Sequence, residues 1–256
     1  MPPARMGRWF WSFNMALLIT LILGLFFLLG VLVVQFSAKS EHIEHYSIAV
    51  AFGAMIGIGV LDIIPEILEI TPVKSFFLPI IGVILGFVVL VCLDKFIPEH
   101  EEDEDELYSA ENMVHIGIIS SIAIVLHNII EGMAVYSLAA QSINQGLMLM
   151  IGVGLHNIPM GMFIYSTLRS RTGWKRNVLI IAAVISTFIG GVVMMLLAPY
   201  ISVSFDGVLY GIALGMIIYI VFMELLPYVR KNKSRITSIV CSIIGLAIVL
   251  VSVLME

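Results

Sequence analysis

The chain has 256 residues, of which 60% are hydrophobic and 12% are charged, and its formal net charge is −5. Soluble domains carry about 25% charged residues, so this composition leaves too few charges to solvate a surface in water and excludes an ordinary soluble protein. The modest negative charge and the lack of a basic patch give no indication of nucleic acid binding.

A membrane-spanning helix needs roughly 20 mostly apolar residues in succession. Eight segments meet this requirement, near residues 9–36, 47–70, 76–94, 114–140, 146–168, 177–200, 205–228 and 237–255. The first follows Arg5 and Arg8, as in a signal peptide, but its apolar run is too long and no small-residue cleavage site follows it. We therefore predict an all-α membrane protein in which residues 1–256 form one transmembrane domain of eight helices.

The connection after the third segment is unusually acidic. Residues 99–106 read EHEEDEDE, so seven of eight are acids. Such a run cannot enter lipid. We predict an acidic cytoplasmic loop at about residues 95–112, with simple solvation as its main role and weak cation collection as the alternative.

The distribution of lysine and arginine predicts the orientation, because these residues accumulate in cytoplasmic loops. One set of alternate connections contains ten of them: Lys39, Lys95, Arg169, Arg171, Lys175, Arg176, Arg230, Lys231, Lys233 and Arg235. The opposite side contains only Arg5, Arg8 and Lys74. This bias predicts a multi-pass protein of the plasma membrane with both termini on the extracytoplasmic side.

Glycines recur four residues apart in several segments. The clearest cases are Gly53 and Gly57, Gly82 and Gly86, and Gly207, Gly211 and Gly215. Small residues at this spacing let helix backbones approach closely in lipid, so we predict packing at these positions.

The fourth and fifth segments carry ionisable residues where a span is normally apolar. One pattern occurs twice, 29 residues apart, as His127-Asn128 followed by Glu131, and as His156-Asn157. A charged side chain at the bilayer centre costs roughly 2.5–3.5 kcal/mol, so such residues mark functional sites by default. His127 and Glu131 share a helix face, and His156 can join them from the antiparallel neighbour. Imidazole and carboxylate together suit zinc and similar divalent ions, so we predict a metal site. The alternative is that these residues only form polar packing contacts between the helices.

Two other segments place a carboxylate beside a proline. Asp62 and Glu66 flank Pro65 in the second segment, and Glu224 precedes Pro227 in the seventh. These carboxylates either reach water at the membrane interface or act as relay points, and weaker metal ligands, along an ion path.

Together these residues resemble the ZIP family of divalent metal transporters over most of the chain. The most specific elements are HNxxEG at residues 127–132 and HNxPxG at residues 156–161, and residues 65–66 and 215–227 are also similar. The resemblance implies eight spans, external termini and a variable cytoplasmic loop after the third helix. It also implies alternating access of an elevator or rocking kind. Zinc is the leading transported ion, with iron, manganese or cadmium as alternatives, and Glu224 corresponds to a carboxylate nearer the cytoplasmic exit.

By the same resemblance, Glu131 bridges two metal positions. Two imidazoles, His127 and His156, complete the first position. Two amides, Asn128 and Asn157, complete the second.

Two departures from the family pattern lower the negative charge of this site. Met160 stands where the fifth helix of the family carries a carboxylate, and residues 187–190 contain no acid where the prokaryotic branch carries a glutamate. Two divalent ions against one carboxylate would leave uncompensated charge, so we expect a single ion. The Met160 thioether is either inert packing or a soft ligand of the type that favours Cu(I).

The sequence therefore predicts a transporter that moves a divalent metal ion into the cytoplasm, and not an enzyme. One alternative is a metal sensor or scaffold of the same family that has lost transport, as the missing carboxylates suggest. A less favoured alternative is an intramembrane metallohydrolase that uses zinc-bound water, although no HExxH or GxSxG motif is present. The expected partners are the metal ion as substrate and the lipid bilayer, with a homodimer as an option and no nucleic acid.

Overall fold

The computed structural model describes residues 3–37, 42–96, 110–169, 173–197, 203–232 and 234–255. The acidic run at residues 99–106 lies outside the described residues. The elements, in chain order, are α1 (Pro3–Phe36), α2 (Ile43–Gly57), η1 (Ile58–Ile63), α3 (Ile64–Ile70), η2 (Val73–Ser75), α4 (Phe77–Phe96), α5 (Ala110–Gln141), α6 (Ile143–Thr167), α7 (Trp174–Leu197), α8 (Val203–Tyr219), η3 (Ile220–Leu225), α9 (Leu226–Lys231) and α10 (Arg235–Val253).

Within these ranges, eight helical stretches are long and apolar enough to cross a membrane. They are Asn14–Phe36, Ile43–Ile70, Val73–Lys95, Asn112–Gln141, Ile143–Thr167, Trp174–Leu197, Gly207–Lys231 and Arg235–Val253. Large apolar side chains such as Ile84 on α4 and Ile243 on α10 are exposed, as expected for helices that face lipid. The predicted all-α architecture with eight spans is confirmed.

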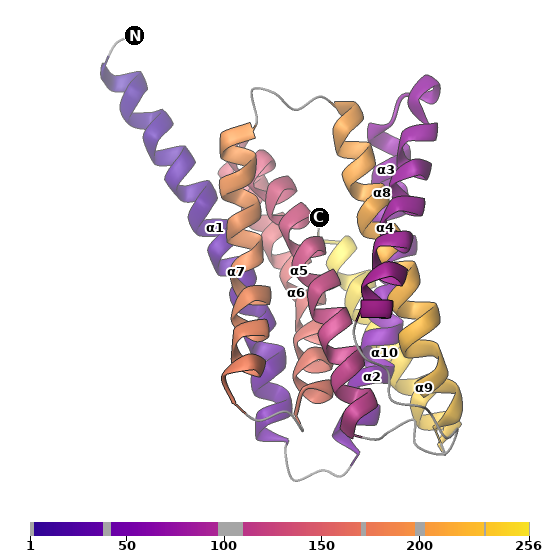
Figure 1. Cartoon of the computed structure of the whole chain (residues 1–256). Helices are drawn as coiled ribbons and strands as arrows, with labels where there is room; N and C mark the ends of the chain where they lie inside the picture. The colour runs from indigo at the N-terminus through magenta and orange to yellow at the C-terminus, as the bar shows by residue number, and fades with distance from the viewer. Residues whose placement is uncertain are drawn as a thin grey trace.

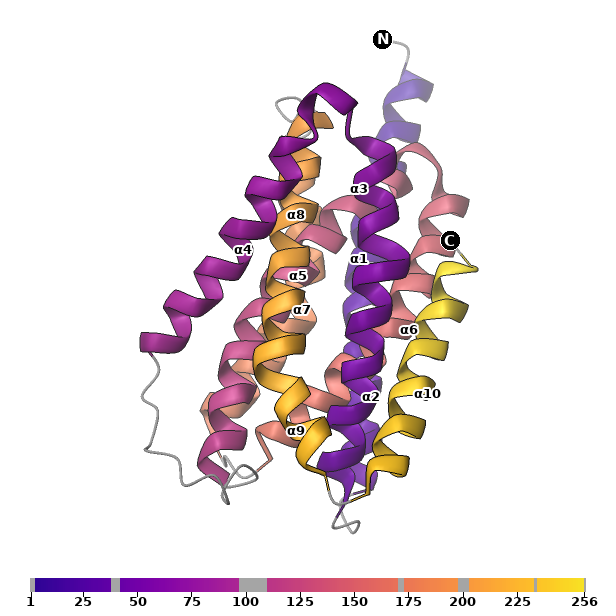
Figure 2. The same ribbon diagram turned by 90° about the vertical axis from the view of Figure 1, so that its right-hand side faces the viewer.

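The spans form two four-helix bundles, which lie side by side in Figure 1. One contains α1, α5, α6 and α7, with its closest pairs α1–α6 and α5–α7. The other contains α2 with α3, α4, α8 with α9, and α10, with its closest pairs α4–α8 and α2–α10. The α4–α8 and α2–α10 neighbours are clearest in the rotated view of Figure 2. The bundles meet chiefly where α6 packs against α2 and α10, and where α5 packs against α8.

Reciprocal glycine contacts hold each of the four closest helix pairs. Between α5 and α7, a Cβ on Gly132 would overlap the carbonyl of Thr187, and a Cβ on Gly190 would overlap the carbonyl of Ile129. The other pairs repeat this two-way arrangement with Gly30 and Gly161, Gly86 and Gly215, and Gly53 and Gly245. The backbones therefore touch directly, which is how helices associate strongly in lipid. The packing role predicted for Gly53, Gly86 and Gly215 is confirmed.

The second and seventh spans are each interrupted by one π-helical turn, η1 and η3. A proline follows each turn, Pro65 after η1 and Pro227 after η3. Proline has no N–H to bond the carbonyl four residues earlier, so the helix widens locally. Each turn carries one carboxylate, Asp62 or Glu224, and π-helical turns are common at functional sites.

Candidate metal centre

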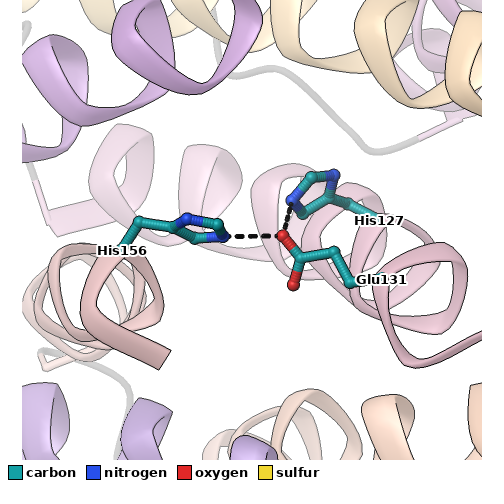
Figure 3. A group of neighbouring side chains, drawn as sticks. All are labelled: His127, Glu131 and His156. Carbon is teal, nitrogen blue, oxygen red and sulfur yellow. Dashed lines mark hydrogen bonds and ion pairs between the residues drawn. The ribbon is translucent and has the colours of Figure 1, made fainter. Parts of the chain in front are cut away.

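Three side chains from α5 and α6 meet in Figure 3. By residue number they lie near the middle of the spans Asn112–Gln141 and Ile143–Thr167. His127 and Glu131 lie one turn apart on α5, and His156 points at them from α6. The Nε2 atoms of His127 and His156 lie 2.6 and 2.7 Å from the same oxygen, Oε1 of Glu131. In the described part of the chain these residues form the one group of His, Cys, Asp or Glu whose ligand atoms converge, all within 4.8 Å of one another.

The group is almost completely shielded from solvent. The exposed fractions of the side chains are 5% for His127, 10% for Glu131 and 1% for His156. The His156 contact has hydrogen-bond alignment, whereas the His127 contact is an ion-pair distance without that alignment. A carboxylate this deeply buried needs such partners, because an unpaired buried charge is strongly destabilising.

The asparagine after each histidine is fully buried. Nδ2 of Asn128 donates a hydrogen bond of 3.1 Å to the carbonyl of Ala183 on α7. Oδ1 of Asn128, both amide atoms of Asn157 and Oε2 of Glu131 have no hydrogen-bond partner among the described residues. A buried polar group left in this way costs about 1–3 kcal/mol, and few such groups occur in folded proteins. The three oxygens, Oδ1 of Asn128, Oδ1 of Asn157 and Oε2 of Glu131, are therefore available as metal ligands.

The two positions at which the family pattern has a carboxylate, 160 and 190, have different surroundings in this structure. Met160 follows His156 by one turn of α6 and is 1% exposed within the hydrophobic core. Gly190 lies directly against the Ile129 carbonyl of α5, where even a Cβ would overlap. A glutamate at position 190 is therefore incompatible with this α5–α7 contact. Position 160, in contrast, already accommodates the long side chain of Met160.

A cavity of about 520 Å³ extends between the two bundles to Glu131. Its lining includes four acids, Asp62, Glu66, Glu69 and Glu131. The exposed residues Glu69 and Gln141 line its outer part, at the end of the molecule where α3 and α5 end. The predicted residues Asp62 and Glu66 therefore line the cavity that runs from this end of the molecule to Glu131.

Asp62 brings a carboxyl group close to the centre from the opposite bundle. Its carboxylate is close enough to interact electrostatically with the three central residues, His127, Glu131 and His156. The π-helical turn η1 carries Asp62 on the second bundle, whereas the other three belong to the first. The centre therefore combines groups from both bundles, which the separate motifs along the chain did not indicate.

Glu224 belongs to a different polar group, nearer the opposite end of the spans. It is 7% exposed, and Tyr219 lies within hydrogen-bonding reach of both Glu224 and Asp94. His115 of α5 adds a contact of 2.9 Å from its Nε2 to Oδ1 of Asp94 on α4. This group links the two bundles.

Residues 93–252, more than half of the chain, match the model of the ZIP zinc transporter family. The zinc transporter ZupT of Lysinibacillus sphaericus is 30% identical, with 93% of this chain and 96% of the relative covered. The ZupT proteins of Oceanobacillus iheyensis and Clostridium perfringens are 29% and 28% identical, with 94% of this chain and 97% and 95% of the relatives covered. The chain therefore belongs to the ZIP zinc transporter family and is a multi-pass transporter of the plasma membrane, not an enzyme.

Proposed function

We propose that this protein carries divalent metal ions, zinc foremost, into the cytoplasm, and that the ion binds between His127, Glu131 and His156. The observation that carries this proposal is the convergence of their ligand atoms within 4.8 Å. Glu131 also lines the cavity between the bundles. The relatives named as zinc transporters support zinc as the leading ion.

The chemistry of the three ligands suits a transported zinc ion. Two imidazole nitrogens and one carboxylate oxygen are common zinc ligands, and three protein ligands leave a position for water or an incoming group. The cysteines of the chain, Cys92 on α4 and Cys241 on α10, are not members of the group. Binding without thiolates is favourable enough for entry and weak enough for release, as transport requires.

Asp62 compensates for the carboxylates that this chain lacks. A divalent ion facing Glu131 alone would retain one uncompensated positive charge in a low-dielectric interior, which is costly. Asp62 interacts with the same three residues and lines the same cavity. With both carboxylates ionised, a single zinc ion would be electrically balanced, and a second ion would not.

The second metal position of the family is retained in weakened form. Its oxygens are Oδ1 of Asn128, Oδ1 of Asn157 and Oε2 of Glu131, and all three lack hydrogen-bond partners among the described residues. Two of these ligands are neutral amides. We therefore expect one tightly bound ion between the histidines and only weak occupancy of the amide position.

The route of the ion follows the carboxylates. Glu69 and Glu66 line the outer cavity, where negative charge attracts cations from the exterior. The distribution of basic residues assigns this end of the molecule to the extracytoplasmic side. Glu224, beside Tyr219 towards the opposite end, serves as a carboxylate on the exit side.

Uptake of radioactive zinc into proteoliposomes that contain the purified protein tests the proposal. We expect saturable uptake by the unchanged chain and its loss in Glu131→Gln, which keeps the size of the side chain but removes the charge. Asp62→Asn should weaken uptake by raising the zinc concentration needed for half-saturation. Glu44→Gln, at the far end of α2, is the matched control and should transport normally.

The same assay separates the alternatives. A sensor or scaffold would bind zinc but give no uptake above empty vesicles, with zinc, iron, manganese and cadmium each tested. Uptake that survives Glu131→Gln would show that the ion passes elsewhere.

A further inference from the structure

The ring of His156 has a second contact, on the side away from Glu131. Ser252 of α10 is fully buried, and its Oγ lies 3.4 Å from Nδ1 of His156. The same hydroxyl donates a hydrogen bond to the carbonyl of Gly152, one turn earlier on α6. His156 is therefore held between a carboxylate on one ring nitrogen and a serine hydroxyl on the other.

The direction of these hydrogen bonds sets the protonation of the ring. A serine hydroxyl has one proton and two lone pairs, and that proton is used on Gly152. Oγ therefore presents a lone pair to Nδ1, so Nδ1 must carry the proton and donate. With Nδ1 protonated, the contact between Nε2 and Oε1 of Glu131 is a hydrogen bond only if a second proton lies between these two atoms. A metal ion bound at Nε2 would replace that proton and use the Nε2 lone pair, which faces the other ligand atoms.

We propose that Ser252 is a positioning residue for metal binding, which fixes His156 in the tautomer and ring orientation that a metal ion requires. Histidine ligands almost always donate their other N–H to a fixed acceptor, which orients the ring and makes it a better donor to the metal. The proposal rests on the role of His156 as a metal ligand in the proposed function.

The contact also links the metal centre to the opposite bundle. α10 packs against α2 in the second bundle, whereas His156 and Glu131 belong to the first. The geometry of His156 thus depends on how the two bundles lie against each other. Zinc affinity is highest in the arrangement in which Ser252 reaches Nδ1.

Zinc titration of the purified full-length protein, in competition with a fluorescent chelator, tests this role. We expect Ser252→Ala to weaken zinc affinity about tenfold or more, the usual cost of removing such a partner. Ser242→Ala is the matched control, because the Ser242 hydroxyl on the same helix also bonds a backbone carbonyl, that of Ser238, at 2.8 Å. Its zinc affinity should stay unchanged.

A double-mutant cycle distinguishes positioning from a general effect on folding. In the His156→Gln background, Ser252→Ala should cause no further loss of affinity. An equal loss in both backgrounds would show a merely structural role and overturn the proposal. If His156→Gln weakens binding and Ser252→Ala does not, the positioning role is wrong and the proposed function stands. If neither change alters affinity, the proposed metal centre itself is wrong.

An isosteric pair keeps the test available if Ser252→Ala is poorly folded. Ser252→Thr and Ser252→Val have nearly the same shape, but only threonine keeps the hydroxyl. We expect the threonine variant to bind zinc more tightly than the valine variant. Equal affinities in two folded proteins would contradict the proposal.

Discussion

His127, Glu131 and His156 depend on one another energetically. Both imidazoles face the same carboxylate oxygen, and none of the three side chains is more than 10% exposed. Loss of one partner leaves the others buried with fewer contacts, which is destabilising in a low-dielectric interior. A zinc ion placed among them would replace these contacts with metal bonds, so binding exchanges one set of interactions for another.

Met160→Glu tests the arrangement of ligands at the residue scale. Position 160 lies one turn from His156, where a carboxylate can supplement the amide oxygens of the weaker position. The additional negative charge should allow a second divalent ion, so the stoichiometry should rise from one towards two. Calorimetric titration of zinc into the purified protein measures this directly.

Gln145→Glu provides the control for this prediction, because it adds the same charge to an exposed position in the first turn of α6. Its stoichiometry should remain one. A folded Met160→Glu protein that still binds one ion would count against the placement of position 160 beside the amide oxygens.

Some of the centre is visible in the sequence, and some is not. His127 and Glu131 are predictable because four residues on a helix make one turn, and His156 because a short connection makes α5 and α6 antiparallel neighbours. Ser252 is not predictable in this way, because it is an ordinary serine in an apolar span. The proximity of Asp62 to the histidines likewise depends on contacts between distant helices that no local pattern encodes.

At the scale of helices, the length of an apolar segment predicts where a span occurs but not which type of helix each of its turns adopts. An apolar count cannot distinguish an α-helical turn from a π-helical one, so η1 and η3 were not expected. The spacing of a carboxylate three residues before a proline, in Asp62 to Pro65 and Glu224 to Pro227, is the signal that marks both turns. The glycine spacing, in contrast, correctly predicts close packing.

Gly190→Ala tests the close contact between α5 and α7. The new methyl group would overlap the Ile129 carbonyl, so the helices must separate. Overpacking of this kind costs about 1–3 kcal/mol, and the protein should unfold at a lower temperature. Thermal unfolding of the metal-free protein in detergent measures the loss.

Gly59→Ala is the matched control, because a Cβ there would meet only side-chain atoms at 3.5 and 3.9 Å, which is ordinary contact. Its thermal stability should equal or exceed that of the unchanged chain, since alanine favours helix over glycine. Equal unfolding temperatures for the two variants would mean that α7 can move away from α5 without cost.

At the scale of the whole molecule, the proposed metal centre lies beside a cavity that opens at one end of the spans. The cavity runs between the bundles from one end to Glu131, and residues from both bundles line it. Movement of one bundle against the other would alter this route and the contact between Ser252 and His156 together. The orientation of the chain in the membrane then decides whether the observed cavity faces the exterior or the cytoplasm.

Cysteine labelling tests that orientation. The native thiols, Cys92 and Cys241, are first replaced by alanine. Lys74→Cys and Lys175→Cys then form a matched pair, because both lysines are exposed and lie at opposite ends of the spans. The charge distribution predicts that Lys74 lies outside, on the side of the cavity, and that Lys175 lies in the cytoplasm. A membrane-impermeant maleimide should therefore label the Lys74→Cys protein in intact cells and the Lys175→Cys protein only after permeabilisation. The reverse pattern would invert the chain, direct the cavity towards the cytoplasm, and make the carboxylates at residues 62–69 an exit route.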